Sequence, residues 1–125
     1  MHRVIVVTRR KAGMTREDFL KHWCEDHPVF VSRLPGVRKY MQSPAIEHRK
    51  EWPFDGMAEL WFDSLADIAR AFDGPEARDL FAHEEDFLAD MSWFIAEEAR
   101  DVPLEASGTV NTKRSDHPCP SASPI

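Results

Sequence analysis

The chain has 125 residues, with 16 Lys or Arg against 22 Asp or Glu, so its formal net charge is −6. The basic residues are dispersed among acidic ones, and this pattern excludes the concentrated basic face that most nucleic-acid-binding domains carry. Two cysteines, Cys24 and Cys119, form neither a disulfide framework nor a paired metal motif. The apolar run at 4–7 is far shorter than the ~20 residues of a membrane span. We therefore expect a single-domain cytoplasmic protein with no nucleic-acid or membrane partner.

The N-terminal quarter predicts a strand followed by a helix. Residues 2–9 carry β-branched side chains on both alternating faces, which is typical of a strand covered on both sides. A turn is expected at 11–14. Thr15 with Asp18 three residues later is the signature of a capped helix N-terminus, and the helix is expected to reach about Leu34.

This helix places a histidine on an apolar face. At about 100° per residue, five side chains fall within about 80° of one another: Phe19, Trp23, His27, Phe30 and Leu34. A histidine among such neighbours needs a hydrogen-bond partner or a shifted pKa, and both conditions suit acid–base chemistry. Pro28 cannot donate to the carbonyl four residues earlier, so we expect a bend or a helix restart at His27.

The remainder of the domain predicts three more strands and a second helix. Strands are expected at 37–46, 54–62 and 91–97, and Ser64 with Asp67 caps a helix at 65–72, as in the capping-box pattern. The acidic stretch 76–90 is interpreted as a short helical connection. The order βαββαβ predicts an α+β, ferredoxin-like fold with a four-stranded antiparallel sheet and both helices on one face.

The helix-free face of this sheet is expected to form a subunit interface. The strands are apolar on that side as well, and a monomer would expose a larger apolar patch than soluble monomers tolerate. We therefore predict a homodimer. The domain is assigned to residues 1–104, and residues 105–125, rich in Ser, Thr and Pro, are predicted to be a flexible tail.

Four sequence blocks carry a family resemblance: RRKAGMTREDF, KHWCEDHP, LPGVRKYMQ and FDGMAELWFDS. With these blocks, over roughly residues 3–102, the chain resembles the EthD-like members of the dimeric α/β-barrel superfamily. The resemblance implies two sheets packed face to face across a dimer, and a small-molecule pocket between the helices and the sheet of each subunit. Relatives include proteins that accompany ether-degrading cytochromes, lactone isomerases, and cyclases, dehydratases, decarboxylases or cofactor-free oxygenases of polyketide pathways.

The resemblance also implies roles for individual residues. It points to His27 as the acid–base residue, and to Glu59 and Trp61 as pocket residues. Leu60 stands where lactone-isomerising relatives have a cysteine, which argues against that reaction.

Glu59 is a charged side chain in the middle of an otherwise apolar strand, so it needs a partner. The candidates are His22, His27, Arg9 and Arg38. A pair with a histidine would orient the ring or shuttle a proton, whereas a structural salt bridge is an equally good interpretation. We take His27 and Glu59 as the candidate catalytic pair.

Other polar residues near this region are weaker candidates. On an α-helical wheel His22 lies about 140° from His27, so the two would not readily chelate one metal, and no metal site is expected. We place His22 at the pocket rim. Asp26 is a candidate for orienting the His27 ring, with a solvated acid as the alternative. His48 follows the second strand and either covers the pocket mouth or is a solvated loop residue.

Aromatic side chains complete the predicted site. Trp23, Trp61 and Phe30 are candidate walls for a flat ligand, although ordinary core packing explains them as well. The leading hypothesis is a homodimeric enzyme without a cofactor that dehydrates, cyclises, decarboxylates or isomerises a cyclic or polyketide-like small molecule. The alternatives are a non-catalytic binding or accessory protein of an oxygenase system and a cofactor-free monooxygenase.

Overall fold

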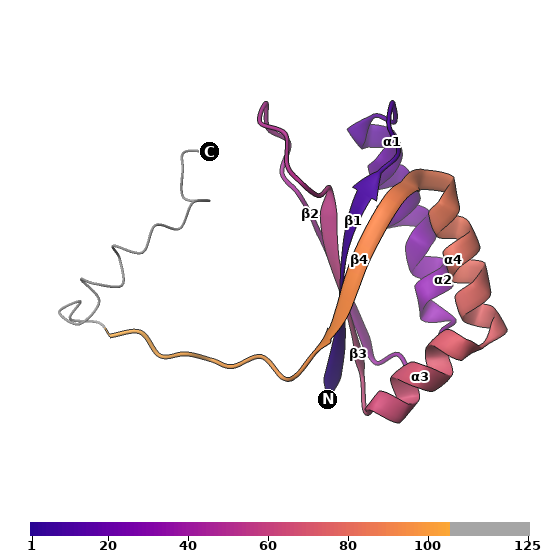
Figure 1. Ribbon diagram of the computed structural model, residues 1–125, viewed down its shortest axis with the longest axis vertical. Coiled ribbons are helices and arrows are strands. Elements are labelled where there is room, and N and C mark those ends of the chain that lie inside the picture. Colours follow the sequence, from indigo (N-terminus) through magenta and orange to yellow (C-terminus); the bar gives the residue numbers. More distant parts are fainter. Residues whose placement is uncertain (106–125) are drawn as a thin grey trace.

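The computed structural model describes residues 1–105 and shows one sheet with helices on a single face (Figure 1). The sheet is antiparallel, with strand order β2-β3-β1-β4. Its strands are β1 (His2–Arg10), β2 (Lys39–Pro44), β3 (Gly56–Phe62) and β4 (Leu88–Ala96). This arrangement confirms the predicted ferredoxin-like α+β fold.

The helices fall into two groups along the chain. The first group is nearly continuous, and the second consists of two helices separated by Gly74. The elements are α1 (Arg16–Leu20), the π-helix η1 (Lys21–Asp26), α2 (His27–Ser32), α3 (Leu65–Asp73) and α4 (Pro75–Phe87). Both predicted caps are present: Asp18 N–H donates to Thr15 Oγ1 at 3.1 Å, and Asp67 N–H donates to Ser64 Oγ at 3.1 Å.

The predicted irregularity at His27 takes the form of a π-helix. The N–H of His27 donates to the carbonyl of His22, five residues earlier, in place of the usual spacing of four. Pro28 follows directly and occupies the first turn of α2, where its missing N–H costs no hydrogen bond. The wider turn therefore absorbs the proline without ending the helix.

The stretch at 76–90 differs from its prediction as a short connection. Most of it belongs to α4, a helix of 13 residues that packs against α2 (Figure 1). The prediction gave weight to the acidic side chains of this stretch and missed its buried helix face. That face consists of residues spaced by three and four positions, as one face of a helix requires: Ala77, Leu80, His83 and Phe87.

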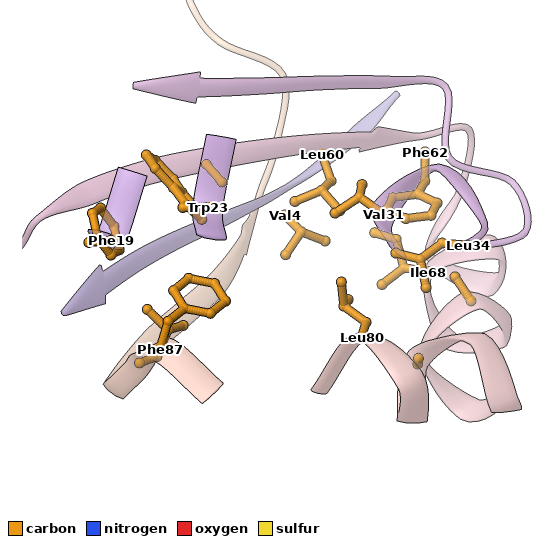
Figure 2. Close-up of a cluster of buried hydrophobic side chains, with 14 residues drawn as sticks. Val4, Phe19, Trp23, Val31, Leu34, Leu60, Phe62, Ile68, Leu80 and Phe87 are labelled. Carbon is orange, nitrogen blue, oxygen red and sulfur yellow. The ribbon is translucent and has the colours of Figure 1, made fainter. Parts of the chain in front are cut away.

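The core lies between the sheet and the helices. Its largest fully buried side chains are Phe19, Trp23, Phe62 and Phe87. Figure 2 shows Val4 and Leu60 of the sheet facing Leu80 of α4 across this layer. Trp23 packs on the backbone of Gly56, where an added Cβ would lie 2.5 Å from the indole ring.

The opposite face of the sheet has no helix over it (Figure 1). Several of its apolar side chains are open, including Phe94, which is 58% exposed, and Met41, which is 45% exposed. Among the described residues, no helix is long and apolar enough to cross a membrane. The predicted flexible tail lies outside the described residues except for Glu105.

Candidate functional site

A cavity of about 540 Å³ lies between the helices and the sheet, within the range of ~300–1,000 Å³ that small-molecule sites occupy. Its polar side chains are few: Thr8, His27, Tyr40 and Glu84. The rest of its wall is apolar and consists of Val4, Val6, Trp23, Val31, Ala58, Leu60, Leu65, Ile68, Ala69, Phe72, Leu80, Phe81, Leu88, Met91, Trp93 and Ile95. Such a cavity suits a largely apolar ligand with one or two polar groups.

His27 is buried at the cavity wall and faces a carboxylate. Its Nε2 lies 3.4 Å from Oε2 of Glu84, and the two side chains are 6% and 14% exposed. His27 begins α2, and Glu84 lies on α4, so the packing of these two helices creates the pair. A carboxylate at this distance stabilises a protonated imidazole, which is what a general base needs after it takes a proton.

The other ring nitrogen of His27 contacts a second histidine. Nδ1 of His27 and Nδ1 of His83 lie 2.9 Å apart, so one of the two nitrogens donates and the other accepts. Burial, and then the neighbouring His27, lower the pKa of His83. The neutral His83 ring can therefore accept at its Nδ1 a hydrogen bond from the Nδ1–H of His27, which leaves the Nε2 lone pair of His27 free to take a proton beside Glu84.

Tyr40 supplies a hydroxyl group to the same cavity. The Gln42 side-chain amide donates to Tyr40 Oη at 2.8 Å and to the Trp23 carbonyl at 2.7 Å. Burial raises the pKa of Tyr40, so its phenol stays protonated. Within residues 1–105 the hydroxyl proton meets no acceptor at hydrogen-bond distance, which leaves it for a ligand oxygen.

The expected pairing of Glu59 with His27 is corrected by the structure. Strand alternation places Glu59 and Trp61 on the helix-free face, and neither lines the cavity. Glu59 accepts a hydrogen bond from Arg3 at 2.7 Å, which is the salt-bridge alternative, and the Lys39 ammonium lies 4.8 Å from the Trp61 ring. The partner that His27 has in the cavity is Glu84.

The other predicted residues divide between the cavity wall and its surroundings. Trp23 lines the cavity, whereas Phe30 lies outside it and stacks on His83 with ring centroids 4.6 Å apart. His22 is half-buried, stacks on Phe87, and does not line the cavity. His48 lies in a separate hollow of about 210 Å³, where its ring is 5.7 Å from that of Trp52.

Asp26 does not orient His27. It is exposed and lies 4.0 Å from Nδ1 of His22, so its nearest imidazole is the rim histidine.

Three residues of the candidate site were not identified from the sequence. Tyr40 is the single tyrosine of the chain and lies in a predicted strand, where packing explains an aromatic residue without a site. His83 and Glu84 are adjacent in an acidic run. The spacing of Ala77, Leu80, His83 and Phe87 is typical of one buried helix face. That pattern in the sequence would have predicted that the His83 side chain points inward.

The fold and cavity define a class: ferredoxin-like α+β proteins with a cavity between the helices and the sheet and with one sheet face that no helix covers. The model of the EthD domain family matches residues 11–91, and the chain belongs to this family. The search of curated proteins finds no match.

Solved structures agree with this assignment. An EthD family protein from Bacillus halodurans is 19% identical with a TM-score of 0.68, covering 79% of this chain and 99% of its own. A dimeric ferredoxin-like protein from Thermobifida fusca is 16% identical with a TM-score of 0.64, covering 78% and 90%. A Nitrosomonas europaea protein assigned as an antibiotic biosynthesis monooxygenase is 16% identical with a TM-score of 0.57, covering 80% and 100%. At these identities the likeness shows the shared fold alone.

Proposed function

We propose that this protein is an enzyme that uses acid–base chemistry, without a cofactor, on an apolar cyclic or polyketide-like small molecule. The observation that carries this proposal is the contact of His27 with Glu84 at the wall of an otherwise apolar cavity. Dehydration, cyclisation, decarboxylation and isomerisation of such molecules share one requirement, which is transfer of a proton next to a carbonyl or hydroxyl group.

The geometry supports a different chemical role for each of three side chains. His27 takes a proton from the ligand, and the Glu84 carboxylate stabilises the imidazolium that results. Tyr40 donates its hydroxyl proton to the ligand oxygen on which negative charge develops. In a cavity with so few polar groups, both interactions are stronger than they would be in water.

The ligand itself is expected to be flat and apolar. Trp23 and Phe72 belong to the cavity wall, and aromatic walls favour ring systems through stacking and apolar burial. The test below therefore uses a panel of such compounds.

The quaternary structure belongs to the same proposal. We infer a homodimer formed by the helix-free sheet face, because Phe94 and Met41 are open there and the Arg3–Glu59 pair lies among them. A second copy would cover this face. The cytoplasmic location that we expect from the sequence stays a prediction.

The experiment compares wild-type protein with His27→Ala and Tyr40→Phe on a panel of anthrones, hydroxyketones and aromatic polyketide lactones, with product formation followed by mass spectrometry. We expect turnover in the wild type and a loss of about 10²–10⁴-fold in His27→Ala, the range of a general base. Cys24→Ala changes an exposed residue in the same helical segment outside the cavity and serves as the control.

Wild-type rates in His27→Ala would overturn the proposal. Binding of panel compounds without turnover would favour the accessory binding role, and oxygen consumption with an anthrone would favour the monooxygenase.

A further inference from the structure

We propose that His22, Asp26 and His83 form a binding site for a divalent transition-metal ion of the zinc type. One ligand atom from each of the three residues lies within 4.8 Å of the others. None of the three residues lines the apolar cavity, and the cluster meets the proposed catalytic site only through the contact between His83 and His27. It is therefore a second site, separate from the proposed catalytic one.

The fold builds this cluster from two elements. His22 and Asp26 both lie in η1, and His83 comes from α4, which packs alongside. The angle of about 140° between His22 and His27 holds for an α-helix. In the structure the N–H of His27 donates to the His22 carbonyl, so this segment has π-helical geometry instead. This wider turn brings His22 to the side that faces α4, with its ring centroid 6.1 Å from that of His83.

The donor set selects the class of ion. Two imidazole nitrogens and one carboxylate oxygen suit Zn²⁺ and its neighbours, whereas Mg²⁺ and Ca²⁺ prefer all-oxygen ligands. His83 already uses Nδ1 toward His27, which leaves Nε2 for the metal. Three protein ligands leave a fourth position open to solvent.

The cluster needs only a small adjustment to close around an ion. Bonds of about 2.1 Å in a tetrahedral site place ligand atoms ~3.4 Å apart. His83 is held in place by burial, while the side chains of His22 and Asp26 are 37% and 56% exposed, with Nδ1 and Oδ2 4.0 Å apart. Side chains with this much solvent exposure have the freedom to move inward by the remaining distance.

Metal binding would also affect His27 at the cavity wall, because His83 and His27 share a hydrogen bond. A histidine that binds a metal through one nitrogen donates from the other, and here the acceptor is Nδ1 of His27. In the metal-bound state His27 would therefore carry its proton on Nε2, toward Glu84, and would lack the free Nε2 lone pair with which it takes a proton from the ligand. Only this consequence rests on the proposed function; the binding site does not.

The experiment titrates the full chain, made without a polyhistidine tag, with Zn²⁺ by calorimetry, and with Co²⁺ by visible absorption. We expect one ion per chain and the strong visible bands of tetrahedral Co²⁺, with no competition from excess Mg²⁺. Because His22 is only half-buried and Asp26 is exposed, His22→Ala and Asp26→Asn should fold normally and bind Zn²⁺ at least ~10-fold more weakly. His48→Ala removes a histidine of the same intermediate burial as His22 elsewhere in the chain and is the matched control, with unchanged affinity.

The proposed site would be wrong if the protein does not bind Zn²⁺, or if His22→Ala and Asp26→Asn bind it with wild-type affinity. It would also be wrong if His48→Ala weakens Zn²⁺ binding as much as His22→Ala does. The measurement needs no substrate, so its failure is distinguishable from failure of the proposed enzyme activity.

Discussion

His27 and His83 face each other through their Nδ1 atoms at 2.9 Å, although 56 residues separate them in the chain. The contact joins the helix after β1 to the helix before β4 and is buried on both sides. It sets the orientation of the ring that faces Glu84, because a ring with one nitrogen engaged has little freedom to turn.

Replacement of His83 by Leu should destabilise the fold. The substitution leaves Nδ1 of His27 buried without its partner, and an unpaired buried polar group costs about 1–3 kcal/mol. Urea unfolding followed by tryptophan fluorescence measures the change in the free energy of unfolding. His48→Leu, in an exposed loop, is the control and should change it by less than about 0.5 kcal/mol. Equal stabilities for the two variants would show that the imidazole contact contributes nothing.

Tyr40 should resist ionisation in the folded protein. Burial raises its pKa above the ordinary value of about 10, so the folded state loses stability only as pH rises above the unfolded-state pKa. Because the chain has one tyrosine, phenolate absorbance reports this residue directly. We expect no phenolate in the folded protein at pH values where the same chain in urea is already titrating, with Tyr40→Phe as the blank. Coincident titration curves would contradict the buried hydroxyl.

Gly56→Ala should disturb the packing of Trp23 on β3. The new Cβ would lie 2.5 Å from the Trp23 ring, so the indole or the strand must shift. Overpacking of this kind costs about 1–3 kcal/mol. Gly74→Ala is a matched control, since its Cβ meets only the flexible Glu76 carboxylate at 3.0 Å. Chemical denaturation compares the two variants, and an unshifted midpoint for Gly56→Ala would contradict the packing.

Ala69→Trp should block ligand binding, whereas Ala66→Trp should not. Both alanines are exposed on α3, but only Ala69 lines the cavity. An indole at position 69 can fill the space that an apolar ligand needs. Binding of an apolar fluorescent dye to each variant measures the effect, and we expect at least a ~10-fold loss of affinity for Ala69→Trp alone, or about 1.4 kcal/mol. Equal affinities would place the ligand elsewhere.

Phe94→Asp should convert the expected dimer to a monomer. Phe94 lies on the helix-free face, and a charge there would have to be buried against a second copy. Val29→Asp introduces the same charge at an exposed position of α2 and should leave the mass unchanged. Sedimentation velocity distinguishes the two outcomes. A Phe94→Asp protein that sediments as a dimer would move the interface to another surface.

Local patterns in the sequence determined most of the fold. The capping pairs at Thr15 and Ser64, the strand alternation, and the proline at position 28 depend on neighbours within a few residues, so periodicity and cap chemistry were sufficient. The inward direction of His27 followed in the same way, and it is 5% exposed in the structure.

Tertiary packing alone decided which residues meet His27. Strand alternation by itself does not say which sheet face the helices cover, so the sequence did not predict the face on which Glu59 lies. In the structure Glu59 lies on the helix-free face beside Arg3. Glu84 and His83 come from a helix that enters the site through α2–α4 packing, and His22 faces it because of a π-turn that an α-helical wheel does not contain. Contacts between residues distant in the chain depend on how elements pack, and periodicity carries no information about that.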